Sequence, residues 1–600
     1  MNKPKDTNPR KKADHTLLYI IEAVAAIVLV LAIALFVHFD KPAEPSASAK
    51  KLNLLGTSVV TADVWSEIGS APAGNIAKNV VFLSVSNGQE RATVFHGSGS
   101  TLEQAWDNAA GKTLQYMAAN DLEPYWVKAD VVCATDTITK DELNSFLAQS
   151  LSGNFRFGLA FDPNFNIAIL EEDLNSALIY DYENDEINDE RLADYFKYYG
   201  LSTAKANPDT YTAFQCTSWF CDENSKVYKL CSDKYRYGRR ETYELNETHG
   251  VFAANMISTA LDYLVAHVND DGSFVYELFP PVDEPSDAYN NVRHAGTVWA
   301  MIEAYRTHPT DEAAKQIEKA VGYMCDHISY DLKGNAYLYD EVENEISLGG
   351  SAIAVLALTE YENTFNNKDT DICTALGNGI LEMFDETTGE YYHILNRDFS
   401  HKEKFRTVYY DGEATFALCR LYEMTGEKKW LDAAQKAVQH FIDMDYTQYC
   451  DHWVAYSMNE ITKYFPENQT YYEFALKNVS ANTVQLSAQH GTAPVYLELL
   501  MSTFELYERM LENGISVNRF DADELLSLIS LRVECQLNAF FFPEYAMYMK
   551  NPQRILNTFM TRSDNFRIRI DDVQHNIGGF YLYLQNYDAL IAAGMTPITN

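Results

Sequence analysis

The pattern of hydrophobic and polar positions changes near residue 249. Before that point, residues 76–204 combine short apolar runs with helical segments, which predicts a small two-layer α/β domain. Residues 205–248 alternate aromatic and polar side chains, which predicts a β-hairpin that connects two domains. The elements predicted for the first domain are strands at 80–85, 91–95, 125–132 and 155–161, and helices at 101–119 and 139–150.

From residue 249 to the end of the chain, apolar residues recur at the i, i+3, i+4 and i+7 positions that are typical of helices. Twelve such segments follow one another, which predicts six helical hairpins. The predicted helices span 250–268, 290–307, 311–330, 346–363, 368–385, 409–426, 429–445, 451–465, 468–486, 491–513, 520–541 and 573–593.

The two helices of each predicted hairpin differ in character. The first is amphipathic and rich in Lys and Glu, whereas the second begins with a polar or Gly-rich cluster and continues with small apolar residues, as in SAIAVLALTEY. This alternation predicts an inner ring of apolar helices shielded by an outer ring. In this respect, residues 249–600 resemble the (α/α)6 toroids, in particular the six-hairpin glycosidase-like superfamily. The sequence therefore predicts a mainly α protein, with an (α/α)6 toroid after the α/β domain.

A membrane anchor is predicted at residues 17–38. The run Leu17–Val37 contains Glu22 as its one charged residue, and about 20 apolar residues span a bilayer. A cleaved signal peptide is the alternative, although its apolar region is normally shorter. Residues 1–16 are basic, which predicts a cytoplasmic tail and an extracytoplasmic bulk. Residues 39–75 are expected to form a stalk or linker.

Charge and cysteine content narrow the functional classes. The chain carries 47 Lys and Arg against 85 Asp and Glu, a net charge of −38, which argues against a nucleic-acid partner. It also argues against a polyanionic substrate unless the site is locally basic. Nine cysteines include a cluster at Cys216, Cys221 and Cys231, where a disulfide is possible. No cofactor motif is present, and we expect no cofactor and no metal.

The polar clusters provide the candidate site. All inner helices of a toroid run in one direction, so the clusters at their N-termini converge on one mouth. Four of the six clusters contain a histidine, and aromatic residues flank them, as expected for a sugar-binding surface. The predicted substrate-binding residues are Asn291, Arg293, His294, Tyr409, Tyr410, His452, Trp453, His490, Gln574 and His575.

Carboxylates at the mouth point to glycoside hydrolysis. That reaction uses one carboxyl group to protonate the leaving oxygen and a second to activate water or attack carbon, and the resemblance implies such a pair. We expect the catalytic residues among Asp572, Glu413, Asp411 and Asp451, with Asp571 as a neighbouring candidate. Simple helix capping is the alternative for Asp411 and Asp451.

Three other functions remain open. A polysaccharide lyase would use Asn291, Arg293, His294, Tyr409 and Tyr410. A zinc site built from the histidines is also possible, although they lack HxxxH or HxH spacing. A non-catalytic glycan-binding or polysaccharide-assembly factor is the main alternative to an enzyme. The leading hypothesis is a membrane-anchored glycoside hydrolase that acts on an envelope or exopolysaccharide glycan. The synthesis or export machinery for that glycan is a candidate partner.

Overall fold

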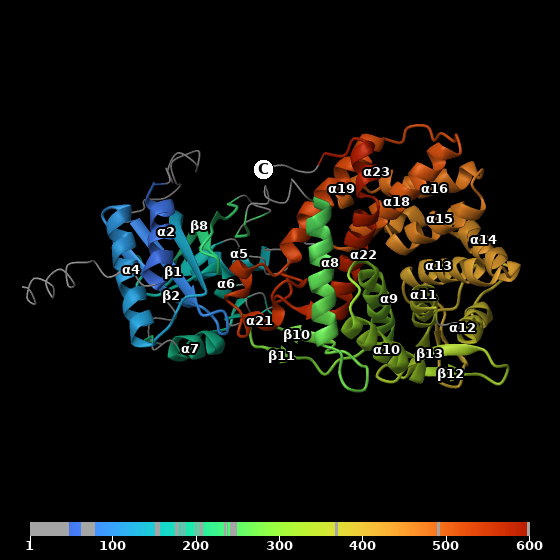
Figure 1. Cartoon of the computed structure of the whole chain (residues 1–600), viewed down its shortest axis with the longest axis horizontal. Coiled ribbons are helices and arrows are strands. Elements are labelled where there is room, and N and C mark those ends of the chain that lie inside the picture. Colours follow the sequence, from blue (N-terminus) through green and yellow to red (C-terminus); the bar gives the residue numbers. More distant parts are fainter. Residues whose placement is uncertain are drawn as a thin grey trace, which may run out of the picture.

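The structure is a computed structural model, and it consists of an α/β unit and a helical unit that lie side by side (Figure 1). The predicted tail and anchor lie outside the described residues. Within the described part of the chain, no helix is both long enough and apolar enough to cross a membrane. The structure describes residues 47–61, 79–149, 157–174, 179–181, 184, 186–198, 201–202, 208–232, 236, 238–240, 249–366, 370–488 and 493–596.

An antiparallel sheet forms the centre of the α/β unit, in the order β2-β1-β3-β8-β4-β5, with β9 paired to β8. Alternate residues of each strand face opposite sides, so β1 sends Val81, Leu83 and Val85 toward one apolar cluster and Val80 and Phe82 toward another. The strands are β1 (Asn79–Ser86), β2 (Thr93–Gly99), β3 (Trp126–Thr139), β4 (Gly158–Ala160), β5 (Ala168–Ile169), β8 (Thr210–Cys221) and β9 (Val227–Lys229).

Helices cover one face of this sheet. The helix predicted after Thr101 is confirmed as α4, and the Thr101 hydroxyl caps it by accepting a hydrogen bond from the Gln104 N–H. Smaller elements complete the unit at its edge. The helices and remaining strands are α2 (Ala47–Thr61), α4 (Leu102–Ala119), α5 (Lys140–Gln149), α6 (Glu171–Leu174), α7 (Asp189–Tyr198), β6 (Tyr180–Asp181) and β7 (Glu186–Ile187).

Two segments differ from the sequence-based expectation. Residues 47–61, expected to form part of the stalk, are helix α2, which buries Leu52 and Leu55 against the sheet. Lys51 holds α2 in place, because its ammonium group donates hydrogen bonds to the Asp222 and Tyr125 carbonyls. The expected connecting hairpin does pair as β8 and β9, but β8 is a central strand between β3 and β4. Its aromatic residues pack within the α/β core, and Cys221 is a buried free thiol.

Six helices form a closed inner ring in the C-terminal unit. Each packs on the next, and the last packs on the first, which confirms the predicted (α/α)6 toroid. Small apolar residues permit this close approach, and α11 is buried at every position from Leu348 to Glu360. The inner helices are α9 (Asn291–Thr307), α11 (Leu348–Phe365), α13 (Tyr409–Thr425), α15 (His452–Tyr464), α18 (Val495–Glu512) and α22 (Ile570–Gln585).

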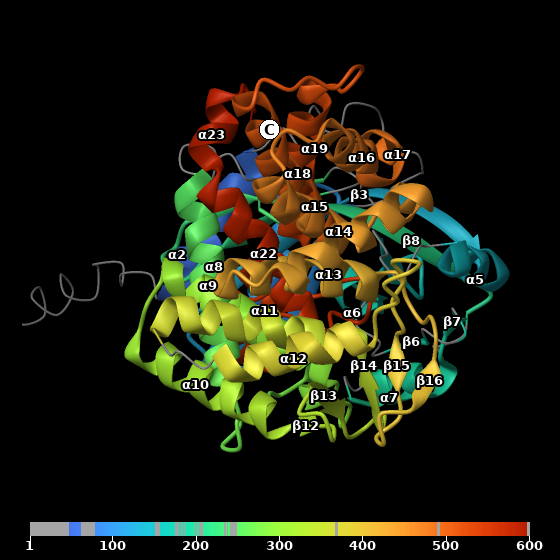
Figure 2. The same cartoon turned by 90° about the vertical axis from the view of Figure 1, so that its right-hand side faces the viewer.

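Six amphipathic helices surround the inner ring (Figure 2). Helix α14 illustrates the pattern, since Trp430, Ala434 and Phe441 are buried while its Lys residues face outward. The outer helices are α8 (His249–Ala266), α10 (Asp311–Asp326), α12 (Thr370–Glu382), α14 (Lys428–Asp443), α16 (Gln469–Ser480) and α19 (Ala522–Gln536).

The connections between helices are distributed unequally. Those from an inner to an outer helix are short, for example 308–310 and 426–427, whereas those that lead into an inner helix include 327–347, 383–408 and 537–569. The long connections lie at the inner-helix N-termini, the mouth of the toroid. They form two small sheets and several short helices: β10 (Glu277–Phe279), β11 (Glu284–Pro285), β12 (Ile328–Tyr330), β13 (Ala336–Asp340), β14 (Glu345–Ser347), β15 (Ile394–Leu395), β16 (His401–Glu403), β17 (Ile568–Arg569), η4 (Tyr446–Tyr449), α17 (Thr483–Leu486), η5 (Leu537–Ala539), α20 (Pro543–Ala546), α21 (Pro552–Ile555) and, after α22, α23 (Tyr587–Ala592).

The second face of the α/β sheet packs on the long connection 537–569. Met547 and Tyr548 belong to the same apolar cluster as Phe82, and the Tyr548 hydroxyl donates a 2.7 Å hydrogen bond to Ser84. Lys128 is fully buried at this interface, 2.9 Å from Asp130 and 2.5 Å from Glu172. Burial alone would lower the pKa of Lys128, but these two carboxylates raise it well above its usual value. The α/β unit is therefore attached next to the mouth of the toroid.

Candidate active site

A cavity of about 380 Å³ lies at the mouth of the toroid. Its wall comes from the N-terminal turns of all six inner helices and from loops that precede them, so the predicted convergence of the polar clusters is observed. Eight of the predicted site residues line it: Arg293, Tyr409, Tyr410, Glu413, His452, Trp453, Gln574 and His575.

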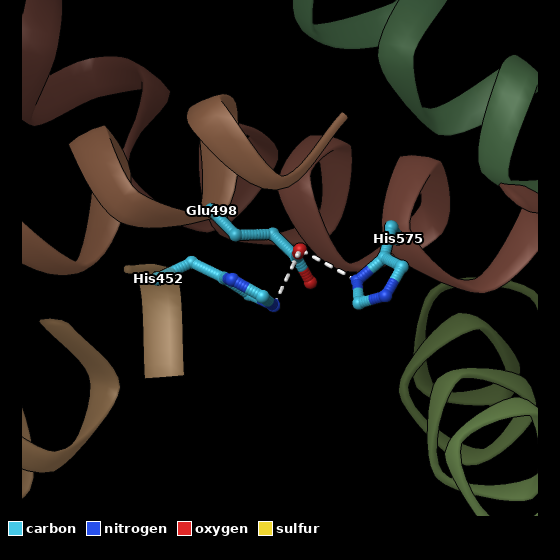
Figure 3. A group of neighbouring side chains, drawn as sticks. All are labelled: His452, Glu498 and His575. Atoms are coloured by element: carbon cyan, nitrogen blue, oxygen red, sulfur yellow. Dashed lines mark hydrogen bonds and ion pairs between the residues drawn. The ribbon is translucent and has the colours of Figure 1, made fainter. Parts of the chain in front are cut away.

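Two imidazoles and one carboxylate meet at this cavity (Figure 3). His575 Nδ1 donates a 2.8 Å hydrogen bond to Glu498 Oε2, and His452 Nε2 lies 3.9 Å from the same oxygen. The two rings are 5.2 Å apart between centroids and almost perpendicular. These three residues come from α22, α18 and α15, so the toroid brings together positions that are distant in sequence.

Glu498 controls the protonation of this group. It is completely buried, and Tyr456 donates a hydrogen bond to its second oxygen, Oε1, at 3.2 Å. Burial alone would lower the pKa of His575, but the Glu498 carboxylate and its hydrogen bond raise it above its usual value. The protonated, imidazolium form of His575 is therefore favoured.

His452 is held differently. Its Nδ1 lies 3.3 Å from Asp451 Oδ1, and its buried Nε2 has no hydrogen-bond partner among the described residues. A carboxylate beside Nδ1 favours the tautomer that carries its proton there. Nε2 is shielded from solvent and faces Glu498 Oε2.

Glu413 is a buried carboxyl group in the cavity wall. Burial raises the pKa of Glu413 well above its usual value, and the nearby Asp451 and Asp411 raise it further. Its Oε2 has no partner among the described residues and lies against Gly349, where a larger residue would collide with it. The protonated form of this carboxyl group is therefore favoured, and that form can donate a proton.

Asp571, rather than the favoured Asp572, lines the cavity. Arg293 and Arg569 both pair with Asp571, through Nε contacts of 2.8 Å and 2.5 Å. Burial alone would raise the pKa of Asp571, but the two guanidinium groups lower it. Asp572 lies outside the cavity wall and accepts a 3.1 Å hydrogen bond from Arg567, which corrects the prediction that placed it in the site.

Two more predicted catalytic carboxylates have structural contacts instead. Asp411 accepts hydrogen bonds from His393 at 3.0 Å and Tyr446 at 2.9 Å, so both of its oxygens are occupied outside the cavity wall. Asp451 caps α15 by accepting a hydrogen bond from the Trp453 N–H. The capping alternative therefore holds for Asp451, which also supports His452.

Asn291 and His294 do not reach the cavity wall. The Asn291 side chain donates to the Tyr339 carbonyl, which anchors a mouth loop. His294 is completely buried between Tyr289 and the Ala320 carbonyl, and burial lowers its pKa to about 4. The residue set expected for a lyase is therefore not assembled. The predicted site residue His490 lies outside the described residues.

Sequence reasoning missed Glu498. Glu498 is the single charged residue in the apolar segment TAPVYLELLMS at the start of an inner helix. This isolated charge could have identified Glu498 as a site residue from the sequence.

The donor atoms of His452, Glu498 and His575 lie within 4.8 Å of one another, a set that a divalent metal such as zinc accepts. The direct 2.8 Å hydrogen bond between Glu498 and His575, however, satisfies these two groups without a metal.

Of the comparisons with known proteins, the one with solved structures finds similar proteins. No protein-family model and no curated protein matches the chain. Cellobiose 2-epimerase from Bacillus thermoamylovorans is 13% identical, with a TM-score of 0.45, and the match covers 57% of this chain and 100% of the epimerase. A D-mannose isomerase is 12% identical, with a TM-score of 0.44 and coverage of 56% and 97%. A GH76 α-mannanase from Bacteroides thetaiotaomicron is 11% identical, with a TM-score of 0.40 and coverage of 58% and 99%. These structural neighbours are carbohydrate-active enzymes.

Proposed function

We propose that the mouth cavity is the active site of a carbohydrate-active enzyme in which His452 and His575 transfer protons to and from a sugar. The observation that carries this proposal is the meeting of the two imidazoles at the buried Glu498. The hydrogen bond to this carboxylate favours the protonated form of His575, and His452 Nε2 faces the same carboxylate without a hydrogen-bond partner among the described residues. A general acid and a general base are thus placed side by side.

This pair suits proton transfer at a carbon next to a carbonyl group. His452 would accept the proton as the C–H bond of an open-chain sugar breaks, and the electron pair would move into an enediol as the His575 imidazolium protonates the carbonyl oxygen. An imidazolium would then return a proton to carbon while an enediol hydroxyl gives up its proton, which restores a carbonyl group. Return to the opposite face of the same carbon gives an epimer, and return to the neighbouring carbon gives an aldose–ketose isomer.

The cavity wall suits a sugar. Trp453, Tyr409 and Tyr410 offer aromatic faces, against which the apolar faces of pyranose rings stack. Gln574 and Arg293 offer hydrogen-bond donors beside them. This combination of apolar surface and a few polar groups is typical of small-molecule sites.

Glycoside hydrolysis is the second candidate, and the protonated Glu413 favours it. Such a carboxyl group can protonate a leaving glycosidic oxygen. The reaction also requires a carboxylate as base or nucleophile. The other carboxylate in the cavity wall is Asp571, whose two oxygens are occupied by arginines. The histidine pair therefore explains more of the observed geometry.

Solvent exchange separates the two chemistries. The full chain, purified in detergent, is incubated in D2O with reducing mono- and disaccharides, and loss of the C2–H signal is followed by NMR. We expect exchange in the wild type and a loss of about 100-fold or more in His452→Gln and His575→Gln, because positioned acid–base groups contribute about 10²–10⁴ in rate. Glu413→Gln is the matched variant that should retain most of the exchange.

The same samples are tested for new reducing ends with envelope and exopolysaccharides. Release of reducing ends that is lost in Glu413→Gln but kept in His575→Gln would replace the proposal with a hydrolase. Binding without exchange or cleavage would instead indicate a non-catalytic glycan-binding or assembly factor.

The location of the site is a separate proposal that rests on the sequence. We propose that residues 17–38 anchor the chain and that the toroid acts outside the cytoplasm on a glycan made or exported by the same cell. Partnership with envelope glycan machinery would follow from that position. Accessibility of the toroid to protease added to intact cells is the expected result, and protection until the membrane is broken would contradict it.

A further inference from the structure

The two cavity arginines occupy electrostatically unfavourable positions. Arg293 lies in the first turn of α9, and Arg569 is the residue directly before α22. A helix N-terminus carries partial positive charge, so a cation there is disfavoured. Asp571 compensates for this placement but supplies one negative charge for two guanidinium groups.

Both arginines retain unused donors. Arg293 binds Asp571 through Nε and the Tyr276 hydroxyl through Nη1, whereas Arg569 binds Asp571 through Nε and Nη2. Within the described part of the chain, Arg293 Nη2 and Arg569 Nη1 make no hydrogen bond. Both side chains line the cavity, with 38% and 22% of their surface exposed, so these donors face the space that a ligand would occupy.

The other charges of the cavity wall do not remove this excess. His575 is paired with Glu498, and burial raises the pKa of Glu413, which favours its neutral form. Behind the wall, Asp572, Asp564 and Glu277 all pair with Arg567. Among the residues that line the cavity, two arginines therefore share one ionised carboxylate, Asp571, in a chain whose net charge is −38. One arginine would be enough to hold the Asp571 side chain in place. The second arginine is explained if a further anion binds in the cavity.

We propose that the cavity binds a sugar that carries an anionic group, a carboxylate or a phosphate ester, and that Arg293 and Arg569 hold this group together. Paired guanidinium groups suit both anions, because each presents donors in a planar fork. The anion would compensate the second positive charge and orient the sugar toward the histidines. The proposal rests on the proposed function in one respect: it takes the ligand to be a sugar.

Three glycosides that differ in one substituent provide the test. Methyl β-D-glucopyranoside, methyl β-D-glucopyranosiduronate and methyl β-D-glucopyranoside 6-phosphate are titrated into the full chain by calorimetry. We expect at least one anionic glycoside to bind about tenfold more tightly than the neutral one, with a preference that falls at high salt. The anion that binds more tightly identifies the group. Equal affinities, or no binding of any of the three, would overturn the proposal.

Variants keep the test independent of folding. Arg293→Gln and Arg569→Gln should each reduce the preference for the anionic glycoside about fivefold or more. Asp571→Asn should strengthen anion binding, because it removes the competing carboxylate, a gain that an unfolded variant cannot produce. Arg554→Gln, which breaks an ion pair with Asp283, is the control. An unchanged preference in both arginine variants would refute the proposal. Because binding is measured without turnover, a failure of proton exchange would leave this inference standing.

Discussion

Gly578 provides the space for the Glu498 carboxylate. The two residues lie on the adjacent inner helices α22 and α18, and a Cβ atom at position 578 would stand 2.6 Å from Glu498 Oε1. Glu498 reaches His575 because this surface of α22 has no side chain. A glycine one turn along the same helix thus determines where the carboxylate lies.

Gly578→Ala should reduce activity more than stability. Alanine favours a helix over glycine by about 1 kcal/mol, which offsets part of the local crowding. The displaced Glu498 would lose its alignment with His575, and a shift of about 1 Å can cost about 100-fold in rate. We expect a 10- to 100-fold fall in proton exchange, measured by NMR, with a melting temperature close to that of the wild type. Gly322→Ala, where a Cβ meets open space on α10, is the control. Unchanged exchange in Gly578→Ala would show that this alignment is unimportant.

The His575–Glu498 pair should stabilise the fold at low rather than high pH. The folded-state pKa of His575 is raised, so the folded protein holds this proton more tightly than the unfolded chain, whose histidines titrate near 6.5. The contribution is complete below about pH 6.5 and is lost as the pH rises through the folded pKa. The difference in melting temperature between the wild type and His575→Gln should therefore shrink from pH 6 to pH 9. A difference that grows with pH would contradict this assignment.

Glu413→Gln should stabilise the protein at alkaline pH. The pKa of the buried Glu413 is raised well above its usual value, so the folded protein keeps a proton that the unfolded chain releases above about pH 4.5. Folding of the wild type is penalised increasingly as the pH rises toward the folded pKa, and glutamine removes the penalty. We expect a gain of about 1–3 kcal/mol at pH 8 by urea unfolding, and no gain at pH 4.5. The exposed Glu382→Gln should change stability by less than about 0.5 kcal/mol.

Lys128→Met should loosen the attachment of the α/β unit to the toroid. The substitution leaves Asp130 and Glu172 buried without their shared cation, and breaking such a buried group costs about 3–5 kcal/mol. We expect a lower unfolding midpoint and faster proteolysis at the boundary between the units. Lys140→Met breaks an exposed pair with Asp189 and should cost at most about 1 kcal/mol. Equal effects of the two variants would show that the buried cluster contributes little.

The sequence predicts the helices of this protein better than its site. Helical periodicity locates the six hairpins because it depends on neighbours along one helix. The contacts of a carboxylate depend on other helices, so sequence could not show that Asp411 binds His393 and Tyr446. Asp571 and Asp572 are adjacent and chemically identical, and the orientation of α22 alone decides which faces the cavity. The position of a histidine at the start of an inner helix correctly predicted that His452 and His575 line the cavity. The same position failed for His294, whose side chain points toward the outer helix α10.

The hydrogen bond between Tyr548 and Ser84 joins residues 464 positions apart and has a consequence for biosynthesis. Strand β1 leaves the ribosome early, whereas the segment that covers the second face of its sheet is made almost last. At translation speeds of roughly 5–20 residues per second, the interval is about 25–90 s. During this time, an apolar sheet face that includes Phe82 and Phe214 has no cover. This face of the nascent chain therefore stays exposed to other proteins until the connection 537–569 has been made and packs on it.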